Sequence, residues 1–203
     1  DTLVPSYATA IGSSADRPAA LAELVGILNN DGLYLPSIRI DRMLFAAGTP
    51  YETVLAPERG RGEQVMNAAV ARFARQELLG VVEHGTATRI NRAFAASDGT
   101  ALEIGGKTGT GDNRFDVYNT AGELVRSTAM NRTATFVFFI GRRFFGTITA
   151  YVPGQAAAQY SFTSSLPVQV LKALAPKLQP LITYSGADEL QVSAAPAGIS
   201  IHK

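Results

Sequence analysis

Apolar residues recur at helical spacing in three segments of the chain. The first follows the capping residue Asp16 and ends at Gly32, and the second extends from Glu63 to about Glu83. The third, "SSLPVQVLKALAPKL", has a serine cap and an early proline, and it is expected to end around Pro176. Such caps, prolines and terminal glycines are typical of helix boundaries. The expected apolar stripes are Leu21, Leu24, Val25 and Leu28; then Val65, Ala69, Phe73, Ala74, Leu78 and Val82; then Leu166, Val170 and Leu174.

Other segments have the shorter period of extended chain. "LYLPSIRIDRML" alternates apolar and polar residues, and "ALEIGGKTGTG" is a strand that glycines weaken. Glycine inside a strand indicates that another backbone or a ligand lies close. "TATFVFFIGRRFFGTITAYV" predicts two strands that are buried on both faces and joined near Gly141 to Arg143. "GTPYETVLAPERGRG" and "DNRFDVYNTAGELVRSTAMNR" are expected to be a loop and a polar connection.

Composition narrows the classes of function. The chain has 203 residues, 46% of them hydrophobic, and a formal net charge of +1, which supports a folded domain and excludes the strong field of a nucleic-acid-binding surface. It contains no cysteine and only two histidines, His84 and His202, so a metal site or a histidine-dependent triad has little support, and no cofactor is expected. The longest apolar run, "FVFFI", is far shorter than the roughly 20 residues of a membrane helix. The chain begins at Asp1 without methionine, so we expect a piece of something longer.

The stretch "IGGKTGTGDN" carries the chemistry, because a lysine behind two glycines can hold either a phosphate or a carboxylate. A phosphate loop needs a glycine where Ala101 stands and a helix directly after the loop, and the sequence predicts neither. On a strand, Lys107 offers a compact ammonium, Thr108 and Thr110 offer hydroxyls, and Gly109 leaves the backbone uncovered. This set suits a terminal carboxylate, as in the K-T-G element of acyl-serine enzymes. A structural salt bridge of Lys107 on an ordinary strand stays open as the alternative.

The surroundings of this stretch resemble a known family. From Tyr7 to about Leu174 the chain is similar to the C-terminal half of the transpeptidase domain of bifunctional, class A penicillin-binding proteins. The resemblance rests on "AALAELVGILNNDGLYLPSIRIDRM", on "LLGVVEHGTATRI", and on "GGKTGTGDN" followed by two strands and a terminal helix. It implies an α+β fold, an antiparallel sheet flanked by helices like that of the β-lactamases, incomplete in this chain. Residues 1–180 would form this half domain, and residues 181–203 a tail or small appended segment.

The resemblance also implies roles for the residues of the stretch. Lys107 would shape the field of a catalytic cleft and help to move a proton. Thr108 and Thr110 would hold the carboxylate of a D-alanyl stem peptide of peptidoglycan or of a β-lactam, the N–H of Thr110 would form half of an oxyanion hole, and Gly109 would leave room for the acyl chain. The parent protein would be extracytoplasmic, on the periplasmic side, and anchored in the inner membrane by an upstream segment. A glycosyltransferase domain would precede the transpeptidase domain.

The chain departs from the family in one respect. The family's nucleophile lies in S-x-x-K and a second serine in S-x-N, both upstream of the matched region. Here S-x-N is absent, and the single S-x-x-K is Ser200 to Lys203. We therefore expect an inactive half of a transpeptidase that carries the substrate-holding strand, or, as an alternative, a noncatalytic module that binds or scaffolds cell-wall machinery. An exposed sheet edge is expected to be covered by a second copy, giving a homodimer, or by the tail.

Overall fold

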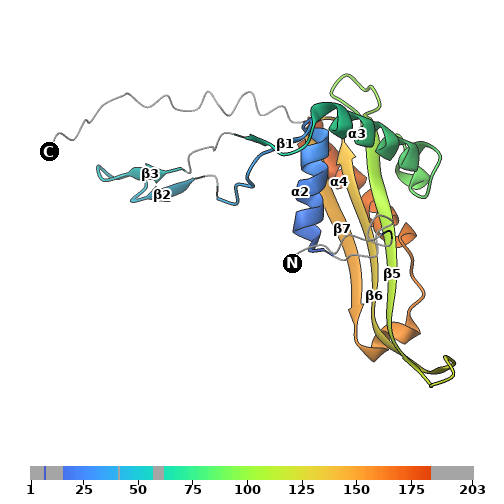
Figure 1. Ribbon diagram of the computed structural model, residues 1–203. Coiled ribbons are helices and arrows are strands. Elements are labelled where there is room, and N and C mark those ends of the chain that lie inside the picture. The colour runs from blue at the N-terminus through green and yellow to red at the C-terminus, as the bar shows by residue number, and fades with distance from the viewer. Residues whose placement is uncertain (1–6, 8–15, 41, 57–61, 184–203) are drawn as a thin grey trace.

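A three-stranded antiparallel sheet lies at the centre of the computed structural model, which describes residues 7, 16–40, 42–56 and 62–183. Its strands are β5 (Ile104–Tyr118), β6 (Leu124–Ile140) and β7 (Phe144–Pro153), in the spatial order β5-β6-β7 (Figure 1). The turn between β6 and β7 falls on residues 141–143, as predicted. The sheet therefore consists of two consecutive hairpins, with the glycine-rich strand at one edge.

Alternation along β6 gives the sheet two apolar faces. Phe136, Phe138 and Ile140 point to the face on which α4 (Ser165–Thr183) lies, in one core with Val168, Leu171 and Ala175 of that helix. Val137 and Phe139 point to the opposite face, where they contact α2 (Pro18–Asn29) through Val25 and α3 (Ala68–Glu83) through Leu79. The α+β prediction of an antiparallel sheet flanked by helices is thereby confirmed (Figure 1). Burial of the strand pair on both faces is confirmed for the second half of β6, whereas β7 is only partly buried.

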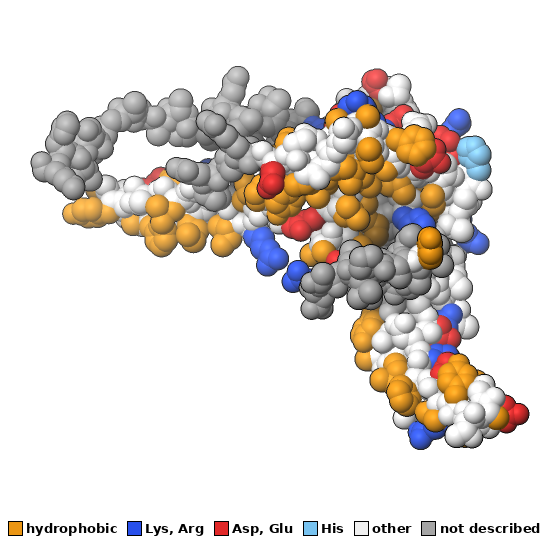
Figure 2. Space-filling model, viewed as in Figure 1, with side chains coloured by type: hydrophobic (Ala, Val, Ile, Leu, Met, Phe, Trp, Pro, Cys, Tyr) orange, Lys and Arg blue, Asp and Glu red, His pale blue; other side chains and the backbone are white. Residues whose placement is uncertain are grey.

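Four short strands form two small antiparallel pairs outside the main sheet. β1 (Leu33–Tyr34) pairs with β4 (Glu63–Gln64), and β2 (Met43–Phe45) pairs with β3 (Thr53–Leu55) in a hairpin that projects from the rest of the molecule (Figure 1). Hydrophobic side chains cover much of this hairpin in Figure 2. The predicted loop around Thr53 thus contains a strand, and the predicted extended segment forms a strand only at its two ends.

The N-termini of α2 and α3 differ from the predicted ones, whereas α4 begins at the predicted serines. Asp16 is not the cap of α2, because Arg17 holds that position; the Asp16 carboxylate accepts from the N–H of Arg17. α3 begins five residues later than expected, since Asn67 caps it by accepting from the N–H of Ala69. The stripe predicted through Val65, Ala69 and Phe73 was wrong, because all three residues are exposed, Phe73 to 68%. The buried positions are Ala71, Arg75, Leu79 and Val82.

The last helix is longer than predicted and turned by one residue. α4 continues through Pro176 and Pro180 to Thr183. Both prolines are exposed, so the carbonyls that lose their helical partners can be hydrated. Its buried positions are Pro167, Val168, Leu171 and Ala175, instead of the stripe predicted through Leu166. The helix thus continues three residues beyond residue 180, where the half domain was predicted to end. The division into a half domain and a tail stays a prediction, because residues 184–203 lie outside the described part.

The predicted polar connection after the glycine-rich strand was wrong. β5 and β6 extend through it as one long hairpin that turns at residues 119–123, where the Asn119 side chain accepts from the N–H groups of Ala121 and Glu123. Exposed apolar side chains, among them Phe115 and Leu124, occupy this solvated end (Figure 2). None of the described helices is long and apolar enough to cross a membrane.

Candidate functional site

The segment Lys107–Thr110 lies in the first half of β5, which among the described residues has β6 as its only strand partner. Opposite residues of an antiparallel pair point to the same face. Lys107 and Gly109 stand opposite Val137 and Thr135 on the face of α2 and α3, and Thr108 and Thr110 stand opposite Phe136 and Ala134 on the face of α4. The four predicted site residues thus share one edge of the sheet but divide between its two faces.

The backbone of this segment presents every second peptide group to the outer edge. The N–H of Gly141 donates to the carbonyl of Glu103 at 2.8 Å, so the odd-numbered residues from Glu103 onward face β6. The N–H and C=O groups of Thr108 and Thr110 therefore face away from β6. Consistent with this, Nζ of Lys107 donates to the carbonyl of Thr108 at 2.7 Å. The ammonium group thus lies at the free edge, beside the outward-facing N–H of Thr110.

Neighbouring loops hold both threonine hydroxyls of the segment. Thr108 is only 7% exposed, and its Oγ1 lies 2.6 Å from Oγ1 of Thr86, in the loop that follows α3. Oγ1 of Thr110 accepts from the N–H of Ser164 at 2.9 Å, just before α4. No chemistry was predicted for Thr86, because nothing in the spacing of the two threonines indicates that they meet.

The glycines of β5 differ in their surroundings: two are closely packed and one borders open space. A Cβ atom on Gly105 would lie 2.3 Å from the Phe139 ring, and one on Gly106 would lie 2.2 Å from the carbonyl oxygen of Val137, so the predicted close approach is confirmed at these two positions. A Cβ on Gly109 would meet nothing within 4 Å. Gly109 therefore leaves open space beside the edge, although packing does not require a glycine there.

A charged pair lies farther along the same strand. Arg132 of β6 stands opposite Asp112, with 3.8 Å between Nη1 and Oδ2. Its side chain is 15% exposed, and its Nε donates to the carbonyl of Phe162 at 2.8 Å. Asp112 and Asp116, which fall in the predicted polar connection, instead lie in β5. No group of three potential metal ligands occurs among the described residues.

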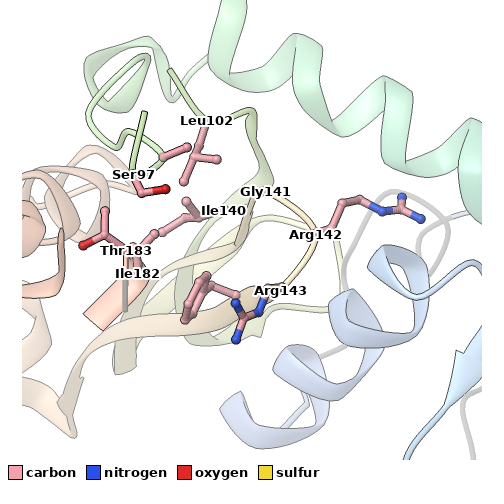
Figure 3. Close-up of a pocket in the computed structure, with 10 residues that line it drawn as sticks. Ser97, Leu102, Ile140, Gly141, Arg142, Arg143, Ile182 and Thr183 are labelled. Atoms are coloured by element: carbon pink, nitrogen blue, oxygen red, sulfur yellow. The ribbon is translucent and has the colours of Figure 1, made fainter. Parts of the chain in front are cut away.

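Two cavities lie away from the Lys107–Thr110 segment. One, of about 180 Å³, is lined by Leu102, Ile140 and Ile182 and by the turn after β6, and Figure 3 shows Arg142 pointing away from it. Nη2 of Arg142 instead donates to Asp31 at 3.0 Å. The other, of about 330 Å³, lies between α2 and Phe145. Neither is lined by the Lys107–Thr110 segment, so the site is an open strand edge.

The geometry tests the phosphate interpretation of Lys107. After Thr108 the chain continues as strand to Tyr118, and no helix N-terminus follows the lysine. A phosphate loop depends on that helix, so the phosphate interpretation is excluded. An ammonium, outward peptide groups and hydroxyls along a free edge can instead receive an extended chain that ends in a carboxylate.

Neither a protein-family model nor a curated protein sequence matches the chain. Solved structures of transpeptidase domains do match it. The D,D-transpeptidase domain of a peptidoglycan glycosyltransferase from Eggerthella lenta matches 77% of the chain at 19% identity, with a TM-score of 0.46. Penicillin-binding protein 3 from Mycobacterium tuberculosis, solved with ampicillin, matches 87% at 18% identity and a TM-score of 0.49. A peptidoglycan synthetase from Bifidobacterium adolescentis matches 81% at 14% identity and a TM-score of 0.47.

The chain spans about a third of the length of these proteins, between 27% and 36% of each. Each match therefore covers only a part of the solved structure.

Proposed function

We propose that the chain is the C-terminal half of a peptidoglycan D,D-transpeptidase domain, in which β5 holds the carboxylate end of a stem peptide. The observation that carries this proposal is the free edge of β5, where the Lys107 ammonium and the peptide groups of Thr108 and Thr110 face outward together. The sequence resemblance around this segment, described above, supplies the reaction.

In the complete domain, a serine upstream of this chain attacks the carbonyl of the penultimate D-alanine. The carbonyl oxygen becomes an oxyanion, and the N–H of Thr110 at the free edge donates to it. The terminal D-alanine leaves, and an amine of a second strand then takes the acyl group from the serine. Lys107 supplies the positive field for the substrate carboxylate and helps to move the proton, while the open space beside Gly109 admits the acyl chain. A β-lactam carboxylate would occupy the same donors.

The cellular setting follows from the same resemblance. The parent protein acts outside the cytoplasm, is anchored in the inner membrane by an upstream segment, and carries a glycosyltransferase domain ahead of the transpeptidase domain. In this setting the present chain alone is inactive and contributes only the substrate-holding strand.

A noncatalytic module is the second candidate, because such a module needs neither of the two serine motifs. The sequence contains S-x-x-K only at Ser200 to Lys203, and it contains no S-x-N. A module of this kind would keep the peptide-holding edge and scaffold other cell-wall proteins.

Intact mass after incubation with penicillin distinguishes the two. We expect a penicilloyl adduct on a chain extended upstream by the missing half domain, and none on the 203-residue chain. In the extended chain, Lys107→Met should acylate more slowly, whereas Lys172→Met, on an exposed position of α4, should acylate like the wild type. Absence of an adduct on both chains would favour the noncatalytic module, and an adduct on the short chain would show that the nucleophile lies within it.

A further inference from the structure

Thr86 is the exposed member of a pair of hydroxyls at the candidate site. Its Oγ1 lies 2.6 Å from Oγ1 of Thr108, and either atom can be the donor. Thr108 itself is 7% exposed, whereas Thr86 is exposed to solvent. Of the two residues, Thr86 is therefore the one that a ligand in solvent can reach more easily.

The position of Thr86 is fixed by its neighbours. The following residue, Ala87, is fully buried, and its N–H donates to the carbonyl of Val81 at 3.0 Å. A Cβ on the preceding residue, Gly85, would lie 2.9 Å from the Val81 backbone, so the loop folds closely over the end of α3. Figure 1 shows the end of α3 and the loop after it on the β5 side of the sheet.

The protons of the hydroxyls at this edge can be assigned in part. Ser164 donates its N–H to Oγ1 of Thr110, so the proton of Thr110 is free for another acceptor. In the pair of Thr86 and Thr108, one proton lies between the two oxygens. When Thr108 donates that proton, Thr86 accepts it and its own proton points outward, and such chains of hydroxyls strengthen one another.

We propose that Thr86 is a further substrate-binding residue of this site, whose hydroxyl donates to the carboxylate of the bound peptide with Thr110 and Lys107. The proposal rests on the proposed function and adds a residue outside the Lys107–Thr110 segment. Two hydroxyl donors and an ammonium match an anion that only accepts hydrogen bonds. A neutral carboxamide gains less from them, because it is uncharged and one of its ends is itself a donor. Thr86 therefore contributes to the selection of a free carboxylate terminus.

The test is a titration of the 203-residue chain with N-acetyl-D-alanyl-D-alanine and with its carboxamide, followed by the amide NMR shifts of Gly109 and Thr110. We expect Thr86→Val to raise the Kd for the free carboxylate about tenfold, the effect of a lost hydrogen bond to a charged group. Thr86→Ser, which keeps the hydroxyl, and Thr88→Val, a matched control on the next turn, should stay within about threefold of the wild type. The Kd for the carboxamide should not change.

The Thr108→Val variant tests whether Thr108 contacts the carboxylate itself or only positions the Thr86 hydroxyl. It leaves the Thr86 hydroxyl in place, so it should weaken carboxylate binding less than Thr86→Val does. A larger loss for Thr108→Val would overturn the inference, because the buried hydroxyl would then be the contact. Thr86→Ala removes the hydroxyl without the added methyl group of valine and is measured alongside, with thermal unfolding as the check on folding.

Other outcomes distinguish a failure of the inference about Thr86 from a failure of the proposed function. If the carboxylate peptide binds the wild type, Thr86→Val and Thr86→Ala equally, Thr86 is not a binding residue and the proposed function stands. If the wild type shows no preference for the carboxylate over the carboxamide, both the inference and the proposed function are wrong.

Discussion

Nε of Arg75 in α3 donates to Oδ1 of Asn29 at the end of α2, at 3.0 Å, and both residues are buried. The same guanidinium lies 4.6 Å from the centre of the Phe139 ring in β6 and donates through Nη2 to Glu103, just before β5, at 2.8 Å. One side chain therefore joins both helices of this face to the sheet. It does so next to the point where β5 begins, three residues before the predicted site.

Replacing Arg75 by Met should destabilise the protein, because the Asn29 oxygen is left buried without its donor. The expected loss is about 1 to 3 kcal/mol, measured by urea unfolding. Glu103 is 63% exposed, so Glu103→Gln should cost less than about 1 kcal/mol. Equal losses for the two variants would mean that the exposed ion pair, and not the buried contact with Asn29, provides the stabilisation.

Arg75 also illustrates what the sequence could predict and what it could not. The apolar spacing correctly predicted a helix ending at Glu83, because tertiary packing requires an apolar stripe. It placed the stripe through Phe73, since an arginine is not expected inside a core. The arginine is buried there because Asn29 and the Phe139 ring provide partners that no local spacing reveals.

At the candidate site, too, the sequence predicts some features and not others. The glycines and the lysine of β5 were sufficient to predict a strand with close packing, and the hydrogen bonds of Thr86 and Ser164 were not predictable, because they depend on loops that are distant in sequence. The polar hairpin beyond Asp112 was predicted as a connection for a related reason. A strand pair solvated on both faces has no apolar alternation to indicate it.

Two glycines of β5 should respond oppositely to alanine. Gly106→Ala places a Cβ against the Val137 carbonyl and should cost about 1 to 3 kcal/mol or more, whereas Gly109→Ala meets open space and should stay within about 1 kcal/mol of the wild type. Thermal and urea unfolding measure both. If Gly109→Ala instead destabilises as strongly as Gly106→Ala, the space beside Gly109 is occupied, and the acyl-chain role proposed for it is contradicted.

The turn at Asp98 predicts a dependence of stability on pH. Oγ1 and N–H of Thr100 donate to Oδ1 of Asp98 at 2.6 and 2.9 Å, and these bonds, the hydroxyl one first, lower the pKa of Asp98. Because the folded pKa lies below the unfolded one, the stabilisation is present above the unfolded pKa and is lost as the pH falls through the folded pKa. Thr100→Val should raise the pKa of Asp98, followed by carboxyl NMR shifts between about pH 2 and pH 6. An unchanged pKa would show that the hydroxyl bond does not form in solution.

The outer edge of β7 is the place where a second copy is expected. Since odd-numbered residues of β6 face β5, its even-numbered residues face β7, where their partners are also even-numbered. The peptide group of Tyr151 therefore faces the outer edge, which has no strand partner among the described residues. Unpaired edges of this kind pair readily with another chain.

Light scattering over a range of concentrations tests this pairing, with a monomer mass of 21.5 kDa as the reference. We expect a dimer at high concentration. Tyr151→Pro removes an outward N–H without breaking a bond to β6 and should yield a monomer, while Tyr151→Thr keeps the N–H and should remain dimeric. A monomeric wild type in dilute and concentrated solution alike would contradict the prediction. A Tyr151→Pro variant that remains dimeric would place the dimer contact elsewhere on the molecule.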